Sequence, residues 1–268
     1  MAWPQRDKLP DNYGEESPGR YTSRGEAGRT LAAALSGILT SLADVPSGPA
    51  GPSTTSTPSI PATPAAPSTP SIPATPRPLV LGLSRGGVAV AAEVARALGL
   101  PFDVVPARKL GIPGHEEVAF GAIASCDGER RSDVDALLVR RLLASGFTEE
   151  SLDRIRERES AELERQETLY LGGRSQGAGG RTVIVCDDGA ATGDTARAAI
   201  AAVRAARARA IVLALPVAPP AVVRDLAKLA DRVVCPRQPM AFRSVGGAYL
   251  TFPQCSDEEV LDLLAARG

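Results

Sequence analysis

Apolar and polar residues alternate along this chain in blocks that are typical of strands followed by helices. The clearest apolar runs are Leu79–Leu83 (LVLGL) and Thr182–Cys186 (TVIVC). Each run leads through a glycine-rich turn into an alanine-rich stretch with helical periodicity, over 88–98 and up to about residue 206. Short, continuously apolar segments between such turns indicate strands that are buried on both faces of a parallel sheet.

The rest of the chain continues this alternation. Further strands are expected at 102–106, 210–215 and 232–235, with a hairpin arm at 119–125. Helices are expected at 23–43, 133–145, 149–167 and 221–229, and after a Ser256 cap. This order predicts an α/β fold, a parallel sheet flanked by helices, with ligands bound at the carboxyl ends of the strands.

The helix predicted at 149–167 is unusually rich in charge, with 12 charged side chains among its 19 residues. Opposite charges four residues apart, such as Glu150 and Arg154, stabilise an exposed helix. We therefore expect a solvated helix whose charges need no functional explanation.

Proline divides the chain into segments. Of 23 prolines, 11 fall within 45–78, where the octapeptide TPSIPATP occurs twice. Such composition favours extended chain, so we expect a Pro/Ser/Thr-rich disordered insertion there, either a tolerated surface segment or, less favoured, a PxxP ligand. Residues 1–20 are polar and are expected to form a flexible N-terminus. The folded domain would then comprise 21–44 and 79–268.

Charge and composition exclude several classes of protein. The 268 residues include 30 basic and 31 acidic side chains, and this balance argues against a nucleic-acid partner. No apolar run is long enough for a membrane span, and the first residues show no secretory signal, so a cytoplasmic protein without membrane association is expected. Four dispersed cysteines and one histidine argue against structural zinc and against a disulfide scaffold.

Candidate chemistry is concentrated after the second apolar run. Two adjacent acids, Asp187 and Asp188, follow the strand and precede a turn of small residues that opens a helix. This turn comprises Gly189, Ala190, Ala191, Thr192, Gly193, Asp194 and Thr195. Small residues let an anion approach the backbone, and a helix N-terminus offers unpaired N–H groups, so the turn suits a phosphate monoester. The acids would instead face a ribose diol or the water shell of Mg²⁺.

This segment resembles the phosphoribosyl-pyrophosphate motif of type I phosphoribosyltransferases. The resemblance implies that Asp187 and Asp188 hold the ribose hydroxyls and that residues 189–195 wrap the 5′-phosphate. It also implies Mg²⁺, held through the ligand and water near the two acids. The expected fold is then the type I phosphoribosyltransferase fold with a small hood and a mobile lid.

A second loop supports the resemblance. Ser84, Arg85, Gly86 and Gly87 follow the first apolar run and open a helix. In the family, a loop at this place binds pyrophosphate through backbone N–H groups and often contains a non-proline cis peptide, which here would be Ser84–Arg85.

The segment 108–117 (RKLGIPGHEE) lies where the family has a mobile lid over the pyrophosphate. Arg108 and Lys109, together with Arg85, are expected to be catalytic cations that stabilise charge on departing pyrophosphate. His115 is either a lid residue or a solvated loop histidine. The run 108–124, with YTSRGEAGRTLAAAL near the start of the chain, also resembles a little-characterised bacterial subgroup of these proteins.

One position departs from the family pattern. Enzymes of the family that act on 6-oxopurines usually carry an acid where this chain has Ala191, so transfer to hypoxanthine or guanine is not expected. Asp194 follows the glycine, where its side chain is expected to point to solvent. Phe242, Tyr249 and Phe252 could stack on an acceptor base, although packing roles are favoured.

Taken together, the residues predict a phosphoribosyltransferase that uses phosphoribosyl pyrophosphate and Mg²⁺. The acceptor would be a small molecule, an unidentified nucleobase or amine, and pyrophosphate would be released. The alternative is a non-catalytic protein of the same fold that senses phosphoribosyl pyrophosphate or a nucleotide. A homodimer is a further expectation of the resemblance, whereas a dinucleotide site is not expected because no G-x-G-x-x-G follows the first strand.

Overall fold

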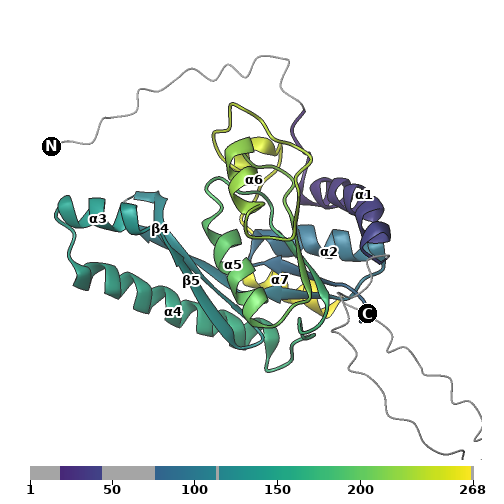
Figure 1. The fold of residues 1–268 in the computed structure, drawn as a ribbon, viewed down its shortest axis with the longest axis horizontal. Coiled ribbons are helices and arrows are strands. Elements are labelled where there is room, and N and C mark those ends of the chain that lie inside the picture. Colours follow the sequence, from purple (N-terminus) through teal and green to yellow (C-terminus); the bar gives the residue numbers. More distant parts are fainter. Residues whose placement is uncertain (1–18, 44–75, 113–114, 267–268) are drawn as a thin grey trace, which may run out of the picture.

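The computed structural model describes residues 19–43, 76–112 and 115–266 (Figure 1). The predicted N-terminal segment 1–20 and the predicted insertion 45–78 therefore lie almost wholly outside the described residues. Within the described ranges, no helix combines the length and the apolar character that a membrane crossing needs.

The main sheet has five parallel strands in the order β2-β1-β6-β7-β8. These strands are β1 (Leu79–Leu83), β2 (Phe102–Val105), β6 (Thr182–Cys186), β7 (Ala210–Ala214) and β8 (Arg232–Val234). Strands β1 and β6 are neighbours in register, with Leu79 opposite Val183. Their carboxyl ends therefore lie side by side, which brings together the two glycine-rich loops that follow them.

Helices cover both faces of this sheet, and the alternation along the strands shows why both faces are apolar. Val80, Ile184 and Val212 face one side, where they pack in a core with α1 (Arg24–Ala43), α2 (Gly86–Leu98) and α7 (Asp257–Ala265). Leu81, Val183 and Leu213 face the other side, against α5 (Asp194–Ala205). The short helix α6 (Pro220–Leu226) follows β7. The predicted α/β fold with a flanked parallel sheet is confirmed.

A second, antiparallel sheet extends to one side of the main sheet, to the left in Figure 1. It consists of β3 (Ala107–Ile112), β4 (His115–Cys126) and β5 (Glu129–Val134), and it is followed by α3 (Ala136–Ala144) and α4 (Glu149–Leu171). Leu110 and Phe120 of the strands pack with Leu152 and Ile155 of α4 in a small separate core. Residues 108–112 and 115–117, which the sequence suggested were a loop, thus belong to paired strands, and residues 133–134, predicted as helix, end β5.

The charged helix α4 has one buried stripe. Its buried residues are spaced three or four apart: Leu152, Ile155, Glu159, Leu163, Gln166 and Tyr170. The prediction of a solvated helix holds for the outer face, where Arg154 and Glu150 form an ion pair of 2.7 Å. It is wrong for the inner face, because Glu159 and Gln166 are only 6% and 1% exposed.

Residues near both ends of the described chain meet in a small hood above the sheet. The Tyr21 N–H donates to the carbonyl of Ala248 at 2.9 Å, and the Leu250 N–H donates to the carbonyl of Tyr21 at 2.7 Å. The ring centroids of Tyr21 and Tyr249 are 5.6 Å apart, and those of Tyr249 and Phe252 are 4.8 Å apart. The aromatic residues of the hood therefore pack chiefly on one another.

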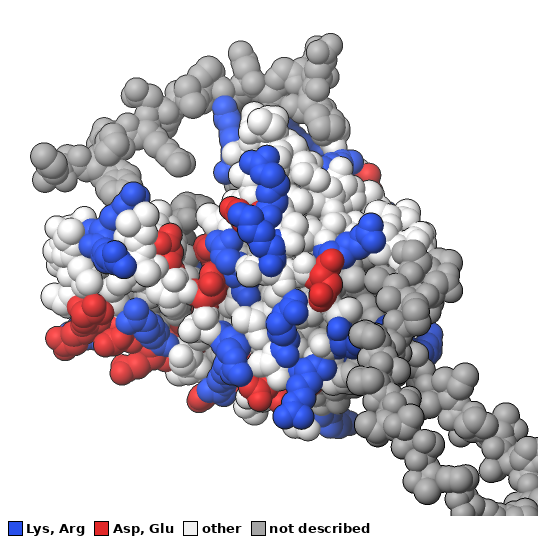
Figure 2. Space-filling view, in the orientation of Figure 1, with Lys and Arg blue, Asp and Glu red and all other residues white. Residues whose placement is uncertain are grey.

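Surface charge is mixed on the face shown in Figure 2, where acidic side chains lie among scattered basic ones. Elsewhere, opposite charges at the surface form ion pairs, such as Lys228–Asp225 at 2.7 Å and Arg204–Asp231 at 3.5 Å. This pattern agrees with the nearly balanced charge of the chain.

Candidate functional site

A cavity of about 770 Å³ opens at the carboxyl ends of β1 and β6. Its walls are the loop 84–86 after β1, the acids and loop 187–195 after β6, and parts of β3, α4 and the hood. The predicted phosphate-binding and pyrophosphate-binding loops thus face a common space. This juxtaposition follows from the pairing of β1 with β6.

The two loops approach each other so closely that glycine is required between them. A Cβ atom at Gly86 would lie 2.0 Å from Oδ2 of Asp188, and one at Gly87 would lie 2.7 Å from the carbonyl oxygen of Cys186. The Ser84–Arg85 peptide is cis, as the resemblance implied.

The adjacent acids form a largely enclosed pair of like charges. The Asp188 N–H donates to Oδ1 of Asp187 at 2.9 Å. Burial raises the pKa of Asp187 well above its ordinary value, and the negative charge of Asp188 raises it further. Burial also raises the pKa of Asp188, while Arg24 and Lys109 oppose this shift. Arg24 and Lys109 thus offset part of the cost of placing two carboxylates side by side in this enclosed site.

Arg24 of α1 supplies the closest of these cations. Its Nε donates to Oδ2 of Asp188 at 2.8 Å, and its Nη1 donates to the carbonyl of Pro253 at 2.7 Å. The guanidinium also lies over the Phe252 ring, 3.9 Å from the centroid. The hydroxyl of Tyr249 donates to the backbone carbonyl of Asp188 at 2.5 Å. Helix α1 and the hood together thus clamp the second acid.

The loop between β6 and α5 has the backbone of an anion site. Gly189 and Gly193 have φ angles of 151° and 82°, a region that favours glycine. The first N–H groups of α5 have no partner within the helix. Asp194 does not point to solvent as predicted, because its side chain is 14% exposed and accepts from Arg197 at 2.6 Å. The Thr192 hydroxyl donates to the same carboxylate at 2.5 Å.

The three predicted catalytic cations line the cavity but differ in their ion-pair partners and in their exposure. Arg108 is bound by Glu159 of α4, at 2.9 Å from Nε and 2.8 Å from Nη2. Arg85 is 3.5 Å from a carboxylate oxygen of Asp257 and is 30% exposed. Lys109 is exposed on β3 and lines the cavity. The side chain of His115 lies outside the described part of the chain, so both interpretations of that residue stay predictions.

Residues 74–249 match the Phosphoribosyl transferase domain family. This chain belongs to that family. Two proteins of Mycobacterium tuberculosis, named "Putative phosphoribosyl transferase Rv0571c" and "Putative phosphoribosyl transferase MT0597", are each 42% identical to it over 187 residues. Those residues cover 69% of this chain and 41% of each relative, so the chain spans less than half the length of the curated relatives it matches.

A solved structure agrees with the fold assignment. The crystal structure of TT1426 from Thermus thermophilus is 31% identical to this chain, with a TM-score of 0.61. The comparison covers 92% of this chain and 99% of that one. With the family match, the type I phosphoribosyltransferase fold expected from the sequence is therefore shown.

Within this phosphoribosyltransferase fold, several residues in the cavity wall, and Arg24 behind Asp188, could not be identified from the sequence. Arg24 lies in the segment YTSRGEAGRT, whose likeness to a bacterial subgroup was the available signal. Arg158 and Glu159 line the cavity, and the signal for Glu159 was its place in a mainly apolar stripe of α4. Gln254, next to the hood, also lines the cavity, and nothing in the sequence pattern pointed to it.

The hood aromatics of this family member are already engaged. Tyr249 is 3% exposed, and Phe252 lies between the Tyr249 ring and the Arg24 guanidinium. Phe242 packs against the same cluster. The structure thus shows the packing contacts of all three side chains, while stacking of an acceptor on Phe252, which also lines the cavity, stays a prediction.

The described residues contain no group of three or more His, Cys, Asp or Glu side chains that could hold a metal ion. Among the carboxylates that line the cavity, those of Asp187 and Asp188 are adjacent. Magnesium is commonly bound by one or two carboxylates, by substrate phosphates and by water. This donor set fits a magnesium ion that enters with a phosphorylated ligand.

Proposed function

We propose that this protein binds phosphoribosyl pyrophosphate with Mg²⁺ and transfers the phosphoribosyl group to a nucleobase or amine. The observation that carries the proposal is the meeting of two loops across one cavity. One loop follows an acid pair and opens a helix, and the other is a glycine-rich turn within contact of that pair. Membership of the phosphoribosyl transferase family supports the same reaction class.

Each part of the ligand has a matching part of the cavity. Asp187 and Asp188 would accept hydrogen bonds from the two ribose hydroxyls. The N-terminus of α5 and the hydroxyl of Thr195 would bind the 5′-phosphate, whereas the hydroxyl of Thr192 already donates to Asp194. Backbone N–H groups of 84–87 would bind the pyrophosphate, with the Arg85 guanidinium beside them.

In the proposed reaction, the bond between ribose C1 and the pyrophosphate oxygen breaks, and its electron pair leaves with pyrophosphate. A nitrogen lone pair of the acceptor forms the new bond to C1, and the acceptor then loses a proton to solvent. Arg85, Arg108 and Lys109 would stabilise the negative charge that develops on the leaving oxygens. Mg²⁺ bound to the pyrophosphate would supply further charge neutralisation. The enclosed acid pair would fix the ribose so that C1 faces the acceptor.

Calorimetry with phosphoribosyl pyrophosphate and Mg²⁺ tests the binding site. In the double variant Asp187→Asn/Asp188→Asn, each amide replaces a charged acceptor, so affinity should fall by at least about tenfold. Asp225→Asn is the matched control, because this carboxylate of α6 is 60% exposed and bound to Lys228 on the surface. Unchanged affinity of the double variant would contradict the site assignment.

Turnover is tested separately. Pyrophosphate release is measured with phosphoribosyl pyrophosphate, Mg²⁺ and a panel of nucleobases and amines. Release that depends on one acceptor identifies the substrate. Tight binding without release for any acceptor would instead support a sensing protein of the same fold.

A further inference from the structure

The buried stripe of α4 contains two polar residues that contact the walls of the cavity. Leu152, Ile155, Leu163 and Tyr170 occupy the neighbouring positions of this stripe. Glu159 and Gln166 lie among them, seven residues and thus two turns apart on the same helix face. A buried polar side chain is destabilising unless it is hydrogen-bonded, so the partners of these two residues indicate their role.

Gln166 is bound to the first residue of the predicted pyrophosphate loop. The Ser84 hydroxyl donates to Oε1 of Gln166 at 3.0 Å and accepts from the Ala107 N–H at 3.0 Å. The hydroxyl has a single proton, and Oε1 of Gln166 is a nearer acceptor than the Ala107 carbonyl at 3.4 Å. The side chain of Ser84 is therefore used within the protein, and pyrophosphate would rely on the backbone of this loop.

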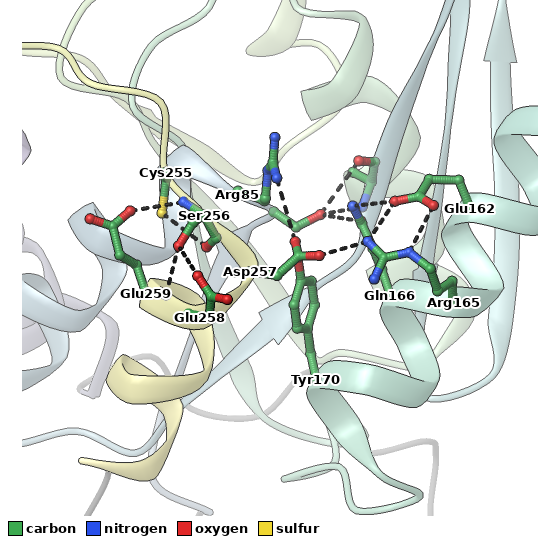
Figure 3. Close-up of polar contacts among 12 residues, drawn as sticks. Arg85, Glu162, Arg165, Gln166, Tyr170, Cys255, Ser256, Asp257, Glu258 and Glu259 are labelled. Atoms are coloured by element: carbon green, nitrogen blue, oxygen red, sulfur yellow. Dashed lines mark hydrogen bonds and ion pairs between the residues drawn. The ribbon is translucent and has the colours of Figure 1, made fainter.

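The next turn of α4 reaches the second residue of the loop through a relay (Figure 3). The Tyr170 hydroxyl donates to Oδ1 of Asp257 at 2.6 Å, and Arg165 donates to Oδ2 at 2.7 Å. Asp257, the first residue of α7, also lies 3.5 Å from Nη1 of Arg85. The Tyr170 hydrogen bond, and after it the bond and charge of Arg165, hold the pKa of Asp257 below its usual range against the effect of partial burial. This carboxylate is thus a fixed anion beside Arg85.

The other polar residue of the stripe reaches the opposite wall. Glu159 accepts from both Nε and Nη2 of Arg108, and its second oxygen accepts from Arg158 at 2.9 Å. Helix α4 therefore contacts both the loop after β1 and the cation on β3. Both would lie at the pyrophosphate end of the ligand.

We propose that α4 positions the pyrophosphate end of the site and that Gln166 is its principal positioning residue, acting through Ser84. This inference rests on the proposed function and adds a residue outside the two recognised loops. Gln166 does not touch the ligand. It sets the hydroxyl of Ser84, and through it the backbone that presents N–H groups to pyrophosphate.

The test measures the two halves of the ligand separately in the full-length chain. Calorimetry gives the affinities for inorganic pyrophosphate with Mg²⁺ and for ribose 5-phosphate. Gln166→Met keeps the length of the buried side chain and removes the acceptor. It should weaken pyrophosphate binding by roughly tenfold and leave ribose 5-phosphate binding within about twofold. Glu164→Gln is the control on the same helix, because that carboxylate is 59% exposed and should change neither affinity.

A double-variant cycle shows whether Gln166 acts through Ser84. Ser84→Ala removes the same hydrogen bond from the other side, so it should lower pyrophosphate affinity by a similar factor. The combination Ser84→Ala/Gln166→Met should be no weaker than either single variant. Losses that multiply to about a hundredfold, or equal losses for both ligands, would overturn the proposal.

Two further outcomes are decisive. Should Gln166→Met fail to fold, Ser84→Ala still decides, because unchanged pyrophosphate affinity in that variant contradicts the proposal. If the unaltered protein binds neither pyrophosphate nor ribose 5-phosphate, the proposed function is wrong, and the positioning role falls with it. The two failures are therefore distinguishable.

Discussion

Replacement of Arg24 by methionine should destabilise the protein, because Asp187 and Asp188 would lose the cation that offsets the repulsion between them. Arg24 is 12% exposed, and its partner Asp188 is 15% exposed. At 2.8 Å and an effective dielectric constant of about 20, their attraction is about 6 kcal/mol before desolvation is counted. Removal of one partner of such a buried pair costs about 3–5 kcal/mol. We expect the lower end, about 3 kcal/mol, because Lys109 still acts on Asp188.

The effect should depend on pH. Burial already raises the pKa of Asp188, and loss of Arg24 raises it further. A carboxyl whose folded pKa is raised destabilises the fold above that pKa, and the penalty disappears as falling pH protonates the group. The stability deficit of Arg24→Met should therefore be larger at pH 8 than at pH 5. For a domain of this size, about 3 kcal/mol corresponds to a fall in Tm of about 6–12 °C.

Thermal unfolding at both pH values is the assay. Arg29→Met is the control on the same helix, since that side chain is 57% exposed and lies 3.9 Å from Glu93. It should alter stability by no more than about 0.5 kcal/mol. Asp188→Asn removes the charge, so the pair Arg24→Met/Asp188→Asn should be more stable than the sum of the single effects predicts. Additive effects together with a deficit independent of pH would refute the electrostatic reasoning.

Two other substitutions test the loops. Gly86→Ala should abolish measurable calorimetric binding of ribose 5-phosphate, because the new Cβ would lie 2.0 Å from Oδ2 of Asp188. Gly37→Ala in α1 is the control: its Cβ meets no atom within 4 Å, and it should stabilise the helix by up to about 1 kcal/mol. Arg197→Met should lower the free energy of unfolding by about 2 kcal/mol and weaken ribose 5-phosphate binding, because Arg197 links Asp194 to Asp133 of β5. The exposed Arg204→Met should do neither, and equal behaviour of the two arginine variants in unfolding and binding would contradict this account.

Much of the main sheet could be predicted from the sequence because its strands are buried on both faces. The predicted strand Thr182–Cys186 matches β6, since a continuous apolar run between polar residues has few alternative structures. Strand β5 was missed at residues 129–134, where the sequence ERRSDV has no apolar alternation. Its register with β4, in which Gly121 lies opposite Val134, is a non-local pairing that periodicity does not reveal.

In the candidate site, too, local sequence motifs could be predicted, whereas residues defined by contacts between distant segments could not. The acid pair and both glycine-rich loops are local motifs, and the structure brings them together as expected. Arg24 could not be singled out, because 27 of the 30 basic residues are arginine and abundance alone carries no information. Gln166 lay within a helix whose charge density hid the polar positions of its buried stripe. Tertiary contacts alone distinguish these residues from their neighbours.

The clamp on Asp188 also has a consequence for the order in which the protein assembles. Arg24 is 164 residues from Asp188 and 229 residues from Pro253 along the chain. Contacts over such separations carry a large loop-closure cost and tend to form after local structure. The acid pair would then gain its cation late in folding, and local opening of α1 would remove it again. A ligand that prefers the clamped pair would hold α1 and the hood in place, so ligand affinity and the docking of α1 are linked equilibria.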